Sequence, residues 1–358
     1  MQAPIEKGKS SNLRYSRSRS PDFMWHRIQK FLSAFVPAVI LLLYCGILVC
    51  FLNRWDSMVA VTLIPFWAWA AVGVLLCLLS WIFFRGPSSI VVLCLWLATS
   101  LFFSEETHTL FRELSEAIDP KTVPENAELL RIASFQSTTG ELDFQRISDL
   151  KPDILLLQLS DPKEETIREL ADHLFGMDGA YFTGGDNAII ARGEFLNILE
   201  DPENNCAHAR LRRKDGFLID ITGISLPASI PSPYLWKKST WDTLTELRKT
   251  NRQRVRGCLG ENPITRPNTA RLVAGGFNTP PGDDIFRPLE TNRMQDSFHV
   301  SGHGWGNTFK GEYPLLRLDQ IWISENLIPL ETETASLPGS IHRAVVAEVM
   351  IAREEESR

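Results

Sequence analysis

The chain has 358 residues, of which 44% are hydrophobic, and its formal net charge is -6. Residues 1–30 contribute +5 and residues 31–103 contribute +1, which leaves -12 for residues 104–358. Non-specific binding of nucleic acids depends on Lys and Arg that neutralise phosphates, so a segment this acidic argues against nucleic acid as a partner. The length is sufficient for one large domain behind a membrane anchor.

Three apolar runs lie near the N-terminus. Residues 31–52 are almost wholly apolar, and about 20 such residues span a bilayer core. Residues 58–84 form a second run, in which Pro65 is of a type that membrane helices tolerate. Residues 89–103 form a third, shorter run. A second run follows the long first one at once, without a small-residue cleavage pattern, so we expect retained membrane helices and no signal peptide.

Residues 1–30 are basic and predict the topology. Seven Lys and Arg oppose two acids there, and the positive-inside rule places such a tail in the cytoplasm. Three spans then put the large domain on the extracytoplasmic side of an inner or plasma membrane. If residues 89–103 lie along the interface instead, the domain faces the cytoplasm.

The rest of the chain reads as a connecting segment, one globular domain and an acidic tail. Pro120 and Pro124 interrupt helical patterning in residues 104–127, the domain covers residues 128–352, and residues 353–358 are the tail. Expected strands are residues 130–135, 153–158, 188–191, 216–221, 271–274, 320–323 and 344–350, and expected helices are residues 144–150, 164–174 and 240–248. Many apolar strands with few helices predict two sheets packed face to face, with helices outside.

Three blocks near the C-terminus resemble a known family. They are Gly275-Gly276-Phe277-Asn278, Arg317-Leu318-Asp319-Gln320-Ile321 and Ser340-Ile341-His342-Arg343. In order and spacing they are similar to Gly-Asp-Phe-Asn, Arg-Ile-Asp-His-Ile and Ser-Asp-His-Arg of the endonuclease/exonuclease/phosphatase superfamily. The resemblance covers residues 129–352. It implies a four-layered α/β sandwich and Mg²⁺- or Mn²⁺-dependent hydrolysis of phosphoesters.

The chain departs from the family at the positions that carry the chemistry. The resemblance implies that Asn278, Asp319 and His342 are retained site residues. Five further family positions are substituted: Gln136 stands for Asn, Leu159 for the metal-binding Glu, Ser225 for His, Gly276 for Asp and Ile341 for Asp. Because Mg²⁺ and Mn²⁺ prefer oxygen ligands, we expect no cofactor, or Mg²⁺ or Mn²⁺ if the chain is active.

Two functions therefore remain. In the first, the chain is a catalytically impaired pseudoenzyme that acts as a binding or scaffold module at the cell envelope. In the second, it is a metal-dependent phosphodiesterase or phosphatase that uses relocated acids, for which Asp161, Asp186, Asp283 and Asp284 are candidates. The expected partners are the lipid bilayer and a phosphate-containing envelope ligand.

Two smaller questions stay open in the sequence. Cys206 and Cys258 are the two cysteines outside the apolar runs, and they form one disulfide or remain unpaired. The basic cluster Arg248, Lys249, Arg252, Arg254 and Arg256 either faces an anion or is a solvated helix end.

Overall fold

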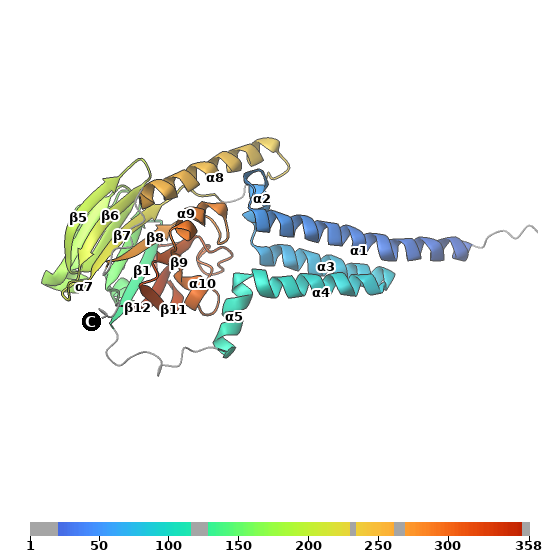
Figure 1. Ribbon diagram of the computed structural model, residues 1–358, viewed down its shortest axis with the longest axis horizontal. Coiled ribbons are helices and arrows are strands. Elements are labelled where there is room, and N and C mark those ends of the chain that lie inside the picture. The colour runs from blue at the N-terminus through green and yellow to red at the C-terminus, as the bar shows by residue number, and fades with distance from the viewer. Residues whose placement is uncertain (1–20, 116–127, 230–233, 261–268, 353–358) are drawn as a thin grey trace, which may run out of the picture.

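The protein consists of a helical bundle and a two-sheet domain joined at one end of the bundle (Figure 1). The structure is a computed structural model and describes residues 21–115, 128–229, 234–260 and 269–352. The predicted acidic tail, most of the predicted basic tail, and Pro120 and Pro124 lie outside the described residues.

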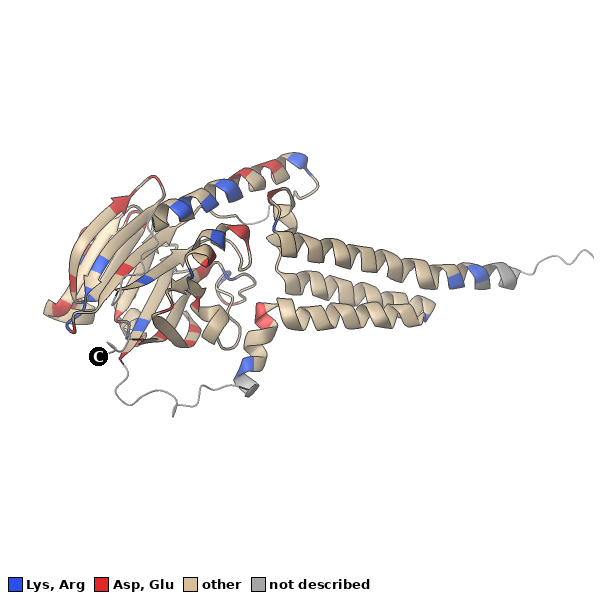
Figure 2. Ribbon diagram, viewed as in Figure 1, with Lys and Arg blue, Asp and Glu red and all other residues tan. Residues whose placement is uncertain are grey.

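The bundle contains three long helices: α1 (Pro21–Asn53), α3 (Phe66–Phe84) and α4 (Pro87–Phe103). Their buried faces share one apolar cluster, and Tyr44 bonds Thr99 across it at 2.5 Å. A Cβ atom at Gly73 would lie 2.2 Å from the ring of the fully buried Trp96, so only glycine admits the indole there. In these three helices, the charged residues lie near the helix ends (Figure 2).

Two of these helices are long and apolar enough to cross a membrane, over Arg27–Asn53 and Phe66–Phe84. A third crossing exists if α4 and α5 (Glu105–Ser115), which are bent by 71° relative to each other, count as one span.

Two boundaries differ from the sequence prediction. The predicted second run, 58–84, is not one helix, because Pro65 caps α3 and separates it from the short helices η1 (Asp56–Met58) and α2 (Val59–Thr62). A proline lacks the N–H that a helix interior requires. The predicted connecting segment 104–127 contains helix α5, whose first turn carries Glu105 and Glu106. Acidic residues at these positions stabilise a helix N-terminus, because they interact favourably with the helix dipole.

One six-stranded mixed sheet has the order β11-β12-β1-β2-β4-β3. Its strands are β1 (Leu129–Ser137), β2 (Ile154–Leu159), β3 (Gly179–Gly184), β4 (Asn187–Arg192), β11 (Leu327–Ser336) and β12 (Arg343–Ile351). Strands β1 and β2 are parallel, and the other neighbours are antiparallel. Helices α6 (Phe144–Asp149) and α7 (Glu164–Phe175) contribute to the apolar layer that covers this sheet.

The second six-stranded sheet has the order β5-β6-β7-β8-β10-β9. Its strands are β5 (Glu194–Asp201), β6 (Cys206–Arg212), β7 (Leu218–Ser225), β8 (Thr269–Gly276), β9 (Gln295–Asp296) and β10 (Asp319–Ile323). Strands β7 and β8 are parallel. Helices α8 (Lys238–Leu259) and α9 (Arg287–Thr291) pack on its outer side, and η3 (Gly176–Asp178), η4 (Asp284–Phe286) and α10 (Ser297–Ser301) complete the domain.

Side-chain alternation along the strands explains the layers. In β1 and β2, Ile132, Ile154 and Leu156 belong to the core between the sheets, whereas Phe135 and Leu155 belong to the outer layer under the helices. Successive residues of a strand point to opposite faces, so a strand buried on both sides is apolar throughout. The predicted four-layered sandwich is therefore confirmed.

Cys206 of β6 and Cys258 of α8 form a disulfide, which settles the alternative that the sequence left open. Both side chains are buried against the outer face of the second sheet. The bond fixes the C-terminal end of α8 to this sheet.

Candidate functional site

The three retained residues come together where the strands of the two sheets end. Gly276 ends β8 and is paired in register with Asp319, the first residue of β10. His342 directly precedes β12, and its Nδ1 atom lies 2.7 Å from Oδ2 of Asp319. The exposed fractions are 0% for Asp319 and 5% for His342. The pair is therefore withdrawn from solvent and held by both sheets.

Asn278 positions a neighbouring loop. Its φ of 52° is in the left-handed region, which asparagine tolerates better than most residues. Its side-chain Nδ2 donates a hydrogen bond of 2.7 Å to the carbonyl oxygen of Leu226, and its backbone bonds Leu318 and Ser229. The hydrogen bonds of Asn278 thus hold the neighbouring segments at Leu226, Ser229 and Leu318 next to the site.

Gln136 occupies the space that a side chain at position 276 would need. A Cβ atom built on Gly276 would lie 2.7 Å from Oε1 of Gln136, closer than real Cβ contacts, and 3.6 Å from Nδ2 of Asn278. The family Asn is one methylene shorter than this glutamine. An acid at position 276 would therefore require the end of the Gln136 side chain to move.

A row of amides continues from Gln136 across the first sheet. Gln136 is in register with Gln158 of β2, and Gln158 is in register with Asn187 of β4. Glycines of the second sheet face this row: a Cβ atom at Gly275 would lie 3.1 Å from Nε2 of Gln158, and one at Gly223 would lie 3.5 Å from Asn187. The two sheets thus enclose amides where they meet at the site.

Several polar atoms of this row are buried without a hydrogen-bond partner. They are Oε1 of Gln136, both amide atoms of Gln158, Oδ1 of Asn187 and Oδ1 of Asp319. Each buried polar atom of this kind costs about 1–3 kcal/mol when unsatisfied. Such a concentration is typical of places that receive a polar ligand or ordered water.

The remaining substituted positions lie around this space without adding a carboxylate. Leu159 packs in the apolar layer beneath the helices, Ile341 is 43% exposed, and Ser225 pairs in register with Gly276. Mg²⁺ and Mn²⁺ are held mainly by oxygen ligands, typically carboxylates. Of the family positions, only Asp319 supplies a carboxylate, and it is bonded to His342. The donor set therefore does not fit the metal that the resemblance implies.

The candidate relocated acids are engaged elsewhere or lie on the surface. Asp283 and Asp284 pair with arginines of α8. Asp161 is an exposed turn residue with a φ of 62°, and exposed Asp186 accepts a hydrogen bond from Asn205. Within the described ranges, the one close group of three potential metal ligands is Asp201, Cys206 and His208, and Cys206 is committed to the disulfide.

The glycine-rich loop before β10 contacts residues of the site. Oγ1 of Thr308 accepts hydrogen bonds from the backbone N–H groups of Leu318 and Asp319, which fixes the start of β10. The ring of Phe309 lies 5.1 Å from that of His342. Trp305 contacts Trp67 of α3 at 6.0 Å between ring centroids, so the loop also touches the bundle.

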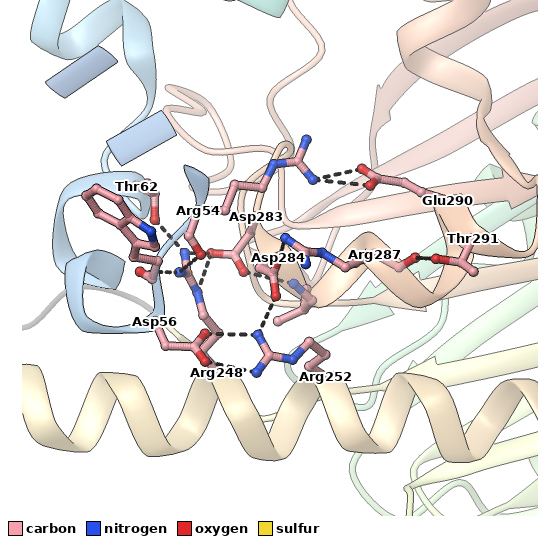
Figure 3. Close-up of polar contacts among 12 residues, drawn as sticks. Arg54, Asp56, Thr62, Arg248, Arg252, Asp283, Asp284, Arg287, Glu290 and Thr291 are labelled. Atoms are coloured by element: carbon pink, nitrogen blue, oxygen red, sulfur yellow. Dashed lines mark hydrogen bonds and ion pairs between the residues drawn. The ribbon is translucent and has the colours of Figure 1, made fainter. Parts of the chain in front are cut away.

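The basic cluster of α8 is divided, because Arg248 and Arg252 bind the bundle (Figure 3), whereas the side chains of Lys249 and Arg256 are exposed, as the solvated-end alternative expects. Arg248, 1% exposed, pairs with Asp283 at 2.5 Å and donates to the carbonyl oxygens of Arg54 and Trp55. It also bonds Thr62 of α2. The positive charges are evident in the sequence. Their partners are acids and carbonyl oxygens far away along the chain, so they could not be identified from it.

Arg252, one turn further along α8, completes this contact. It makes two hydrogen bonds of 2.9 Å to the carboxylate of Asp56, between α1 and α2, and also pairs with Asp284. The hydrogen bonds from Arg252 lower the pKa of Asp56 from its ordinary value. Residues four apart lie on one helix face, so Arg248 and Arg252 present both guanidinium groups to the bundle.

Helix α5 makes a second contact between the bundle and the domain. Arg317, two residues before Asp319, pairs with Glu105 at 2.8 Å and with Asp296 at 2.5 Å. Burial opposes ionisation of Glu105, but Arg317 and His299 together lower its pKa. Arg112 donates to the carbonyl oxygens of His299 and Gly302. The bundle therefore binds the domain on the side that also carries the Asp319 strand.

Comparison with known proteins finds similar structures but no matching sequence family. No protein-family model matches the chain, and no curated protein matches it. Among solved structures, an endonuclease/exonuclease/phosphatase from Bacteroides vulgatus is 16% identical, with a TM-score of 0.45, over 63% of this chain and 99% of that chain. A mannosyl-6-phosphatase from Bacteroides thetaiotaomicron is 15% identical, with a TM-score of 0.44, over 62% and 99%. Beta toxin from Staphylococcus aureus is 11% identical, with a TM-score of 0.45, over 61% and 99%.

Proposed function

We propose that the chain is a membrane-anchored, catalytically impaired relative of endonuclease/exonuclease/phosphatase hydrolases that serves as a binding or scaffold module at the cell envelope. The observation that carries this proposal is that leucine, glycine and isoleucine stand at Leu159, Gly276 and Ile341, where the family has acids, and that amides line the site instead. Gln136 fills the space beside Gly276, and Gln158 and Asn187 extend the amide row. An enzyme of this class needs a metal-bound or base-activated water, and amides supply neither at neutral pH.

The same groups are suited to binding. The amides of Gln136, Gln158 and Asn187 can donate and accept hydrogen bonds, and an imidazole held by a carboxylate can donate to an anionic oxygen. A phosphate-containing envelope ligand is the partner that these donors favour. The acidic character of residues 104–358 argues against a nucleic acid in this role.

The alternative function, a metal-dependent phosphodiesterase or phosphatase with relocated acids, lacks this support. Its candidates Asp283 and Asp284 have arginine partners, and removing Asp283 leaves the buried Arg248 without a carboxylate partner. These acids are accounted for by the attachment of the bundle.

A hydrolysis assay tests the proposal. Full-length protein in detergent is incubated with bis(p-nitrophenyl) phosphate or p-nitrophenyl phosphate, each with MgCl₂ or MnCl₂. We expect the wild type to release no more product than His342→Ala, with His303→Ala as a control at a histidine outside the pair. Turnover that depends on the metal, disappears in His342→Ala and persists in His303→Ala contradicts the proposal.

The proposal also assigns the domain to the extracytoplasmic side. The positive-inside rule places the basic N-terminal tail in the cytoplasm. Three crossings, with the bent α4 and α5 counted as one span, then place the domain on the opposite side of the membrane. In a bacterial host, alkaline phosphatase fused after residue 358 should be active, and a fusion after Arg85, between the second and third crossings, should be inactive. Activity of the Arg85 fusion alone would place the domain in the cytoplasm.

A further inference from the structure

A cavity of about 660 Å³ lies at the junction of the bundle and the two-sheet domain. Its walls come from the domain-side ends of α1, α3 and α4, from α5, and from the loops that follow β8 and precede β10. Sites for small molecules are commonly cavities of about 300–1,000 Å³ at such boundaries. The cavity is separate from the amide row, because none of the row's residues lines it.

One wall of the cavity is apolar and continues the outer surface of the bundle. Leu52, Phe102 and Phe103 line it and are 62%, 75% and 45% exposed, and Phe66 lies beside them. Leu52 and Phe66 sit at the ends of α1 and α3, which are long and apolar enough to cross a membrane, and Phe102 and Phe103 end the apolar helix α4. With the bundle in a bilayer, as proposed above, an acyl chain can reach this wall from the bilayer, whereas a soluble metabolite gains nothing from it.

The opposite wall is charged, and most of its charges are paired. Arg54 pairs with Glu290 at 2.9 Å, and Arg317 lies between Glu105 and Asp296. His299 contacts Glu105 at 3.5 Å, and this hydrogen bond raises the pKa of His299. The carboxylates of Glu105 and Asp296 thus have Arg317 as their shared cationic partner.

Arg112 provides the unbalanced positive charge of this wall. Its guanidinium group donates to the carbonyl oxygens of Gly302 and His299, and among the described residues it has no carboxylate partner. Glu106 also lines the cavity, and burial raises its pKa. Arg112 therefore offers a bound anion a positive charge that is not paired with a carboxylate among the described residues.

We propose that this cavity binds a membrane phospholipid with an anionic phosphodiester headgroup, which lies beside Arg112 while the acyl chains lie along Leu52, Phe102 and Phe103. The inference rests on the membrane anchoring in the proposed function and is independent of the loss of catalysis. It makes the lipid a bridge between α5, the bundle ends and the domain.

The test uses full-length protein purified in dodecyl maltoside and stripped of lipid. Palmitoyl-oleoyl phosphatidylglycerol, at about 100 times its Kd, should raise the Tm by at least about 5 °C, since only the folded junction binds it. The zwitterionic phosphatidylcholine with the same chains should raise it less. Soluble glycerophosphoglycerol, which has the phosphodiester without chains, should leave the Tm unchanged.

Two arginine variants complete the experiment. Arg112→Gln should weaken the apparent affinity for phosphatidylglycerol by about tenfold or more, because a charge-assisted contact is lost. Arg212→Gln, at an exposed arginine of β6 that pairs with Glu194, should bind like the wild type. Equal shifts with the two lipids, or a phosphatidylglycerol shift unchanged in Arg112→Gln, overturn the proposal. An equal shift with glycerophosphoglycerol assigns the site to a soluble phosphodiester and also overturns it.

Extraction of membranes with alkaline carbonate separates this inference from the anchoring on which it rests. A chain that stays in the membrane fraction but shows no phosphatidylglycerol preference has the anchor and lacks the lipid site. A chain that is released by carbonate lacks the anchor, and the proposed membrane function then fails as well.

Discussion

Replacing Arg248 by Met is expected to destabilise the protein by about 3–5 kcal/mol, because Asp283 would remain as a buried charge without its partner. The guanidinium group also satisfies the carbonyl oxygens of Arg54 and Trp55, which connect α1 to η1. At roughly 2–4 °C per kcal/mol for a chain of this size, the Tm in detergent should fall by about 10 °C.

Two further variants make this expectation specific. Lys249→Met changes the neighbouring residue, whose side chain is exposed and pairs with Glu246 at 2.8 Å, and should alter stability by less than about 0.5 kcal/mol. Arg248→Met combined with Asp283→Asn removes both charges, keeps an oxygen to cap η4, and should recover part of the loss. A Tm for Arg248→Met equal to that of Lys249→Met would show that the buried pair does not hold the bundle to the domain.

The second large effect concerns the amide row. The triple variant Gln136→Asn, Gln158→Glu and Gly276→Asp should acquire a Mn²⁺ site, because it places two new carboxylates beside Asp319. The register pairs that join these positions put their side chains on the faces that meet between the sheets. Shortening Gln136 frees the space beside Gly276, whose φ is not in the left-handed region, so aspartate is allowed there.

The measurement is thermal unfolding with EDTA or Mn²⁺. Without metal, three close carboxylates repel one another, and the Tm of the triple variant should lie below that of the wild type. Saturating Mn²⁺ should raise it by about 5 °C or more, whereas Gln136→Asn alone should not respond. A triple variant that folds, with a wild-type circular dichroism spectrum, yet ignores Mn²⁺ would show that the three positions do not share one space.

The sequence predicted the two-sheet architecture because its core strands are apolar on both faces. Ile154–Leu159 and Arg343–Ile351 lie close to the predicted ranges for this reason. It missed β3, β5, β6, β9 and β11. In β5, β6 and β11 polar and charged residues interrupt the apolar pattern, and in β11 Pro329 lies within the strand. Partners across a sheet, and not local propensity, decide such strands.

Helix α8 shows why burial of polar residues escapes sequence analysis. The predicted range, 240–248, stops where the apolar pattern ends, yet the helix continues to Leu259. Its buried face includes Leu244, Arg248, Asn251 and Val255, which follow helical spacing although two of them are polar. Their partners, Asp283 and the carbonyl oxygens of Pro227, Arg54 and Trp55, lie far away in sequence.

At the site, the resemblance identified candidate residues from the sequence, whereas the contacts between them are known only from the structure. Asn278 and Asp319 lie next to the paired ends of β8 and β10 in the second sheet, and His342 directly precedes β12 of the first sheet. The contact between Gln136 and the space at Gly276 depends on a register between strands of different sheets, which no local pattern encodes. Leu159, expected at the site, instead belongs to the apolar layer beneath the helices, because Gln158 takes the inward position in β2.

The most direct measurement is the amount of Mn²⁺ that the wild-type, full-length protein binds, determined from the electron paramagnetic resonance signal of free Mn²⁺ during titration. Because Leu159, Gly276 and Ile341 provide no oxygen ligands from their side chains, we expect binding no greater than that of Asp319→Asn at every concentration. One Mn²⁺ per chain, bound with a submillimolar Kd and lost in Asp319→Asn, would contradict the proposed loss of the catalytic metal.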